Sequence, residues 1–326
     1  MLGAPIYHHW TIFGHIGVIY FFVLSGFIIF HAHAKDIGYP EQGISYFKKR
    51  IIRIYPIYWA VLLIILIKVA FFGNSQTVLP CGLYSWGASI LLLPQQLDNN
   101  PGSNIGGVFA PIDGVAWSLE YEVIFYAFFL ILILHRNLGI FLGVLSFVIY
   151  LLETHDLLFP LSLLKQPYLL IFGFGVAAAW ISRSDIPKNH AAIYGLLGFL
   201  IIALMSLYEV IGLQRYSEQL SVVLSGGGFF LIILCLVAFE KQGRVIGKQP
   251  FLQLIGAASY SIYLVHAPLV HICVKTLSKF QIASLFIPFL FAVLTVFAIL
   301  AGVAVHKMIE QPLISHGRRF LKLKRA

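Results

Sequence analysis

Long apolar runs, separated by short polar or basic stretches, occupy the chain from one end to the other. Each run is long enough to cross about 30 Å of hydrocarbon as an α-helix. Because a helix satisfies its backbone hydrogen bonds internally, apolar runs of this length predict helices that span a bilayer. We expect nine spans, at roughly 14–33, 54–72, 115–134, 138–153, 163–181, 191–208, 220–239, 256–274 and 283–305.

One further apolar stretch, 83–94, is too short to cross, and Pro94 and Pro101 follow it. Segments of this length are more often interfacial or re-entrant. The pattern therefore predicts an all-α polytopic membrane protein with about nine transmembrane helices and one short re-entrant or interfacial segment.

Composition agrees with this pattern. Of the 326 residues, 60% are hydrophobic and only 11% are charged, and the mean hydropathy is +0.89. Soluble domains carry about 25% charged residues, so the low charged fraction of this chain indicates a protein that is largely surrounded by lipid. No interval between spans is long enough for a soluble domain, which predicts a single membrane domain over 1–326.

The net charge of +9 does not indicate a nucleic-acid partner, because the basic residues lie in short loops between spans, as in proteins oriented by the positive-inside rule. Five basic residues fall on one predicted side: Lys68, Lys165, Arg215, Lys275 and Lys279. Seventeen fall on the other: Lys35, Lys48, Lys49, Arg50, Arg53, Arg136, Arg183, Lys188, Lys241, Arg244, Lys248, Lys307, Arg318, Arg319, Lys322, Lys324 and Arg325. This bias predicts a cytoplasmic C-terminus and nine crossings.

With nine crossings, Met1 falls outside, and nothing basic precedes residues 1–7 to anchor an inside end. Two alternatives follow: a genuine external N-terminus, or a first span that is missing from this chain. No cleavable signal peptide is visible. The three cysteines, Cys81, Cys235 and Cys273, lack paired spacing, so neither a disulfide framework nor a metal site is expected.

Two motifs lie in the first two predicted spans. Small residues, among them Ser25 and Gly26, recur in the first span, and they either allow close helix packing or line a local break. Arg50 and Arg53 stand three apart beside Lys49, at the cytoplasmic mouth of the second span. Two guanidinium groups together suit a phosphorylated ligand, but the same charges also suit a positive-inside anchor or anionic lipid head groups.

Two other motifs place polar groups in later spans, where such groups are costly and suggest function. Glu120 and Glu122 open the third span, and they point in different directions on a helix because they are two residues apart. Alternatively, this segment is an interfacial anchor. In the eighth span, Tyr263 and His266 precede Pro268, which hints at a helix break near a cavity. His266 fits either a polar pathway or a hydrogen-bonded packing role.

Taken in order, these motifs resemble the membrane acyltransferase family called acyltransferase 3. Five elements match: the glycine-rich helix at 17–27; R-x-x-R-I-x-P-x-Y-W at 50–59; W-S-L-x-x-E at 117–122; S-Y-S-x-Y-L-x-H-x-P at 259–268; and the terminal Glu310-Gln311-Pro312. Glu122 occupies the position of the motif carboxylate and Glu120 does not. The resemblance covers nearly the whole chain. Some members of this family carry an extra extracytoplasmic hydrolase-like domain, but no appended soluble domain is expected here.

The resemblance implies O-acylation, most often O-acetylation, of a cell-envelope polysaccharide, lipopolysaccharide or secreted glycan at the bacterial inner membrane. Acyl-CoA, in most cases acetyl-CoA, would be the co-substrate, and no cofactor would be bound permanently. Arg50, Arg53 and Lys49 would bind acyl-CoA, and Ser25, Tyr263 and His266 would line a substrate path. The glycan or lipid-linked glycan acceptor and membrane lipids would be the partners.

Acyl transfer needs a base for the acceptor hydroxyl, and His8 is the candidate, oriented by Glu122. Family members open with a helix that carries an Arg and, about eleven residues later, a His. This chain begins too late for that Arg, and His9 and Ala4 are the alternatives to His8 at the position of the His. The family would have ten spans, so the chain as given is expected to be inactive if its first helix is absent.

On this prediction the donor phosphates and the acceptor lie on opposite sides of the membrane, so the acyl group must cross through a channel or on a covalent intermediate. A different class of function is a transporter or flippase that moves a lipid or glycan without chemistry, with His266 and Glu122 along its path. The span pattern shows no internal inverted repeat, which disfavours the transporter.

Overall fold

The computed structural model describes residues 16–72, 79–80, 82–94, 104–105, 108–109, 112–152, 159–184, 190–212, 219–244, 247–277 and 286–321. Nearly all of them are helical, apart from two antiparallel two-residue strands, β1 (Asn104–Ile105) and β2 (Val108–Phe109). The all-α fold class is therefore confirmed. Within the described residues, seven helices are long and apolar enough to cross a membrane.

The described helices follow the predicted apolar runs closely. They are α2 (Ile16–His33), α3 (Gly43–Phe72), α4 (Leu83–Leu91), α5 (Trp117–Leu134), α6 (Arg136–Leu151), α7 (Tyr168–Ile181), α8 (Ala191–Gly212), α9 (Gln219–Lys241), α10 (Pro250–Leu277), α11 (Ile287–Val305) and α12 (Gln311–Phe320). Short 3-10 turns lie at η2 (Pro40–Gln42) and η3 (Leu161–Lys165). Because α6 and α7 are shorter than the other apolar helices, nine crossings remain a prediction.

Three features of the described helices differ from the expectations. The helix expected at 54–72 begins at Gly43, so the basic segment that was read as a loop is helical. The expected tail after residue 305 continues as the π-helical turn η6 (His306–Glu310) and then as α12. Helix α10 runs through Pro268 without the expected break, since neighbouring helices can satisfy the backbone groups that a proline frees.

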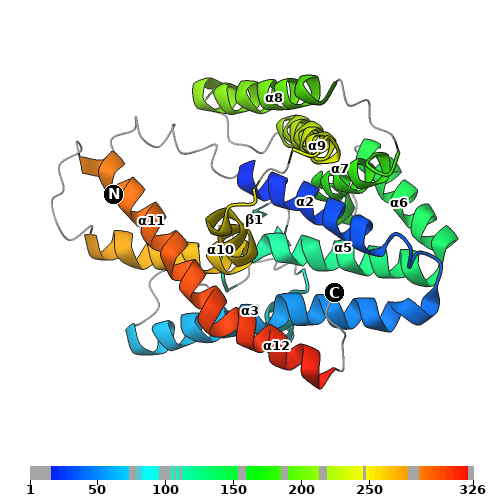
Figure 1. Cartoon of the computed structure of the whole chain (residues 1–326). Coiled ribbons are helices and arrows are strands. Elements are labelled where there is room, and N and C mark those ends of the chain that lie inside the picture. The colour runs from blue at the N-terminus through cyan, green and yellow to red at the C-terminus, as the bar shows by residue number, and fades with distance from the viewer. Residues whose placement is uncertain are drawn as a thin grey trace. The chain divides into compact units, whose positions relative to one another are not determined.

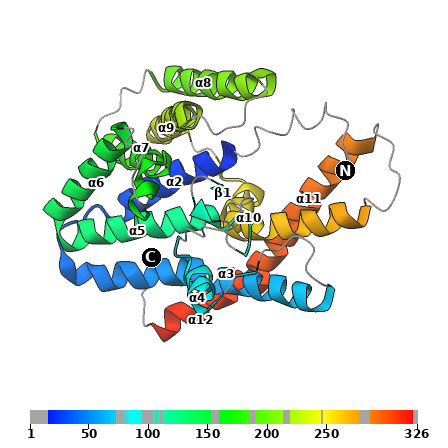
Figure 2. The ribbon, with the colours of Figure 1, turned by 180° about the vertical axis from the view of Figure 1, so that it is seen from behind.

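The helices form two compact units, each of which is described by itself. The second unit comprises the described residues within 16–40 and 124–247. In it, α2 packs against α7 and touches α9, and α8 packs against α9; Figures 1 and 2 show these helices as neighbours. The glycine-rich motif serves this packing, because a Cβ on Gly26 would come within 2.1 Å of the Phe172 carbonyl oxygen.

The first unit comprises the described residues within 41–123 and 248–321, so α5 begins in it and ends in the second unit. Helix α11 packs along α10, and η6 contacts α3, α10 and α11. Helix α12 crosses α3, where Gly317 allows close approach to Ile52. This unit therefore brings α3 and α5, which carry the candidate donor and catalytic residues, together with α10 and the C-terminal helices.

Candidate active site

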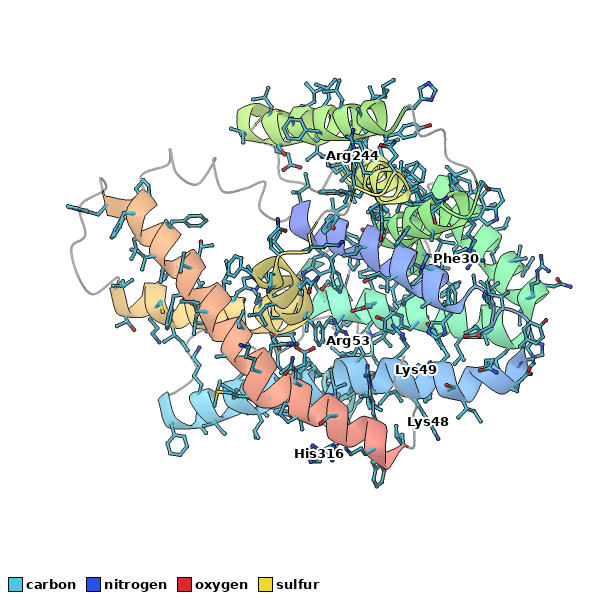
Figure 3. All side chains as sticks on the ribbon, viewed as in Figure 1. Phe30, Lys48, Lys49, Arg53, Arg244 and His316 are labelled. Carbon is cyan, nitrogen blue, oxygen red and sulfur yellow. The ribbon has the colours of Figure 1, made fainter. Side chains whose placement is uncertain are left out.

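The arginine pair lies within α3, in its second and third turns, because the helix begins at Gly43. Lys48, Lys49 and Arg53 follow one another along this helix in Figure 3. The guanidinium carbon of Arg50 lies 5.6 Å from the centre of the Tyr46 ring, and that of Arg53 lies 5.5 Å from the Tyr260 ring. Each guanidinium is thus placed over an aromatic face, an arrangement that suits arginine better than lysine.

Tyr46 links the arginines to the predicted catalytic carboxylate. Its ring is almost fully buried, and its hydroxyl lies within electrostatic range of both Arg50 and Glu122. Glu122 is itself buried, in the second turn of α5. The sequence assigned the donor arginines and this carboxylate to opposite sides of the membrane, whereas the fold brings both groups to the same phenol.

The start of α5 is tied to α10 by hydroxyl groups. The Tyr263 hydroxyl donates to the Val115 carbonyl oxygen at 2.8 Å, and the Ser118 hydroxyl lies 2.8 Å from the Tyr263 oxygen. Two of the motifs quoted above, W-S-L-x-x-E and S-Y-S-x-Y-L-x-H-x-P, therefore meet at this point. The His266 ring is hydrogen-bonded through Nδ1 to the Tyr263 carbonyl oxygen on the same helix.

Two buried carboxyl groups lie beside Tyr58. Glu120 has no exposed surface, and neither of its oxygens has a hydrogen-bond partner in the described part of the chain. Asp113 is also buried, and its Oδ2 lacks a partner among the same residues. Both groups lie within electrostatic range of the Tyr58 hydroxyl, which donates to the Ser89 carbonyl oxygen at 2.6 Å.

Asp113 is a group that the sequence analysis missed. Burial raises the pKa of its carboxyl to about 7, although the Val115 N–H, 3.5 Å from Oδ1, acts in the opposite direction. A signal was present in the sequence, because Asp113 is an acidic residue only two positions before the apolar span predicted at 115–134. In the fold, Asp113 and Glu120 are the two buried carboxyl groups beside Tyr58, at the N-terminal end of α5.

A second missed feature is the set of partners around Glu310. Its Oε1 accepts a hydrogen bond from Arg53 Nη1 at 3.2 Å, and its Oε2 accepts one from Ser261 Oγ at 2.7 Å. The His306 Nδ1 lies 2.6 Å from the same Oε2. Glu310 of the terminal E-x-P element is thus a buried partner of Arg53, the second arginine of R-x-x-R. The two residues are 257 positions apart, so no local sequence pattern indicates this pair.

The remaining candidates lie elsewhere. Ser25 is buried on α2, in the second unit, on the helix that packs against α7. His8 lies outside the described residues. The structure thus gathers Arg50, Arg53, Lys49, Glu122, Tyr263 and His266 in the first unit.

The comparisons with known proteins agree with this set of motifs. The model of the acyltransferase 3 family, described as an acyltransferase domain, matches residues 2–307. The chain belongs to this family and is a multi-pass membrane acyltransferase. It is similar to the "Exopolysaccharide production protein ExoZ" of Rhizobium meliloti (strain 1021), with 26% identity over 319 residues that cover 95% of this chain and 92% of the relative. No solved structure matches the chain significantly.

Proposed function

We propose that the chain transfers an acyl group, in the first instance an acetyl group, from cytoplasmic acyl-CoA to a hydroxyl of a cell-envelope glycan. The family supplies the reaction class, and the printed name of the relative favours an exopolysaccharide, free or lipid-linked, as the acceptor. The proposed location is the bacterial inner membrane, with the C-terminus in the cytoplasm, as the loop charges favour.

One observation carries the proposal. Arg50 and Glu122 approach the same buried phenol, Tyr46, so a donor clamp and a catalytic carboxylate belong to one region of the first unit. Acyl transfer from a thioester requires both parts: cations for the phosphates of CoA, and a group that accepts or orients the proton of the attacking hydroxyl.

The residues then take the following roles. Arg50 and Arg53, with Lys49 beside them, bind the phosphates of CoA, and the Arg53 side chain, which is 42% exposed, is accessible to them. Glu122 orients the base, for which His8 remains the candidate. The hydroxyl oxygen attacks the thioester carbonyl carbon, the C–S bond breaks, and the hydroxyl proton passes through the base to the CoA thiolate.

Donor binding tests the proposal directly. Arg53→Lys keeps the charge and loses the planar fork, so it should weaken the binding of acetyl-CoA to the purified chain. A matched control is Arg183→Lys, because the Arg183 guanidinium also lies over an aromatic ring, that of Phe30 at 5.0 Å, but in the second unit. If Arg53→Lys leaves the affinity for acetyl-CoA unchanged, these cations are topology anchors and the proposed donor site is wrong.

A further inference from the structure

Glu310 is a charged residue without exposed surface whose two oxygens serve three neighbours. Oε1 accepts from the Arg53 guanidinium, while Oε2 accepts from Ser261 and lies next to His306. A buried carboxylate is costly unless it is paired and hydrogen-bonded, and here its hydrogen bonds come from three different segments. Such a site fixes the position of the carboxylate closely.

The helix around Glu310 is modified to make this arrangement. Residues His306–Glu310 form a π-helical turn between α11 and α12, closed by the bond from the Gln311 N–H to the His306 carbonyl oxygen. The Gln311 side-chain amide lies 3.0 Å from His306 Nε2, so both ring nitrogens of His306 have partners. Single π turns inside α-helices are rare and occur frequently at functional sites.

The Arg53 side chain is partly exposed, whereas Glu310, Ser261 and His306 are buried. Glu310 takes one N–H of its guanidinium, and the Tyr260 ring supports the guanidinium at 5.5 Å. The Tyr260 hydroxyl in turn donates to the Ile54 carbonyl oxygen at 3.1 Å, which fixes the ring. Among the described residues, Glu310 is the only acidic partner of Arg53, which leaves other N–H groups of the guanidinium for a ligand.

We propose that Glu310, held by Ser261 and His306, is a positioning residue that orients the Arg53 guanidinium toward the phosphate groups of the acyl-CoA donor. This rests on the proposed function, in which Arg53 binds those phosphates. The Arg53–Glu310 pair contributes no net positive charge, so its benefit is geometric. A guanidinium that is already oriented loses less side-chain entropy when the phosphate binds.

The test compares two probes, CoA and pantetheine, which share the thiol arm and differ in the nucleotide and its phosphates. Their dissociation constants are measured on the purified full chain in lipid nanodiscs. In Glu310→Gln we expect the constant for CoA to rise about fivefold to tenfold, since one long side chain must then be ordered on binding. The constant for pantetheine should stay unchanged.

Two more variants make the comparison specific. Ser261→Ala removes one hydrogen bond to Glu310 without changing any charge, so it should weaken CoA binding about twofold to threefold. If Glu310→Gln does not fold, Ser261→Ala serves as the test in its place. Glu209→Gln is the matched control, because Glu209 is also buried and accepts from a serine, Ser221, at 3.1 Å, but lies in the second unit. It should leave both constants unchanged.

The outcomes separate the inference from the proposed function. Equal affinity of the unmodified chain for CoA and pantetheine would mean that phosphates are not bound, and the proposed donor site would fail. If the unmodified chain prefers CoA and Arg53→Lys reduces this preference, but Glu310→Gln does not, then Glu310 has no positioning role. Tighter CoA binding by Glu310→Gln would also overturn the inference, because Glu310 would then only neutralise Arg53.

Discussion

The hydroxyl of Ser118, in the first turn of α5, lies 2.8 Å from the hydroxyl of Tyr263 on α10, although the two residues are 145 positions apart. The contact fixes the start of the helix that carries Glu122, because Tyr263 also donates to the Val115 carbonyl oxygen just before that helix. Two motifs that the sequence presents separately are therefore parts of one structural arrangement. The role of each can be tested by removing single atoms.

Tyr263→Phe removes the hydroxyl that joins α10 to the start of α5. We expect a loss of about 1–2 kcal/mol in the free energy of unfolding, because the partly buried Val115 carbonyl and Ser118 hydroxyl then lack this partner. Thermal unfolding in detergent measures the change. Tyr84→Phe is the control, since Tyr84 is 75% exposed. Equal midpoints for the two variants would show that the hydrogen bonds at Tyr263 contribute nothing to stability.

Gly26→Ala tests the packing of α2 on α7. A Cβ at this position would lie 2.1 Å from the Phe172 carbonyl oxygen, so the helices must separate, and overpacking of this kind costs about 1–3 kcal/mol. Gly17→Ala is a control on the same helix, because a Cβ there meets no atom within 4 Å, and it should be neutral or slightly stabilising. The expected order of unfolding temperatures is Gly17→Ala above Gly26→Ala.

Asp113 predicts a specific dependence of stability on pH. Its carboxyl titrates at 3.8 when unfolded and at about 7 when buried, so the folded chain holds the extra proton between these values. Stability should therefore fall as the pH rises through this window and stay low above it. Three pH units correspond to about 4 kcal/mol at most for one group.

Asp113→Asn removes this titration while keeping the shape of the side chain. Between pH 5 and pH 8, the unfolding midpoint of the unmodified chain should drop more than that of the variant. Glu41→Gln, at an exposed position, should retain the full drop. An unchanged drop in Asp113→Asn would show that another group is responsible.

The positions of most helices could be predicted from the sequence, but the contacts between the helices could not. Apolar runs fix where helices lie in a membrane protein, because lipid leaves the backbone no other partner. The start of α3 at Gly43 was not predicted, because the charges between Lys48 and Arg53 suggested a loop. In the fold, η6, α10 and α12 pack against α3 and bury some of its side chains, among them Ile52 and Ile54. The Arg53–Glu310 pair depends on a π turn and on tertiary contact, which leave no periodic signal.

The orientation of the chain remains a prediction from its loop charges. The 17 to 5 division of basic residues places the end of α12, the first turns of α3 around residue 48 and the segments around residues 185 and 245 in the cytoplasm. A single cysteine introduced at Phe320, which is 85% exposed, should react with a membrane-impermeant maleimide only after the cells are opened. The native cysteines are first replaced by serine. Labelling in intact cells from the periplasmic side would reverse the topology.

The two carboxylates of α5 give the sharpest test of the active site. Glu122 matches the family element and lies four residues after Ser118, on the same helical face. Both Glu122 and Arg50 act electrostatically on the buried hydroxyl of Tyr46. Glu120 points away from this group and lies beside Tyr58, buried and without a partner among the described residues.

Glu122→Gln keeps the size of the side chain and removes the charge that would orient a base or accept the hydroxyl proton. It should lower glycan acetylation about a hundredfold or more, while the protein remains inserted and folded. Glu120→Gln should be mild, because an amide costs less to bury without a partner than a carboxylate does. Mass spectrometry of the surface glycan from cells expressing each variant at equal levels measures the difference. Equal acetylation in the two variants, or the reverse order, would show that Glu122 does not belong to the active site.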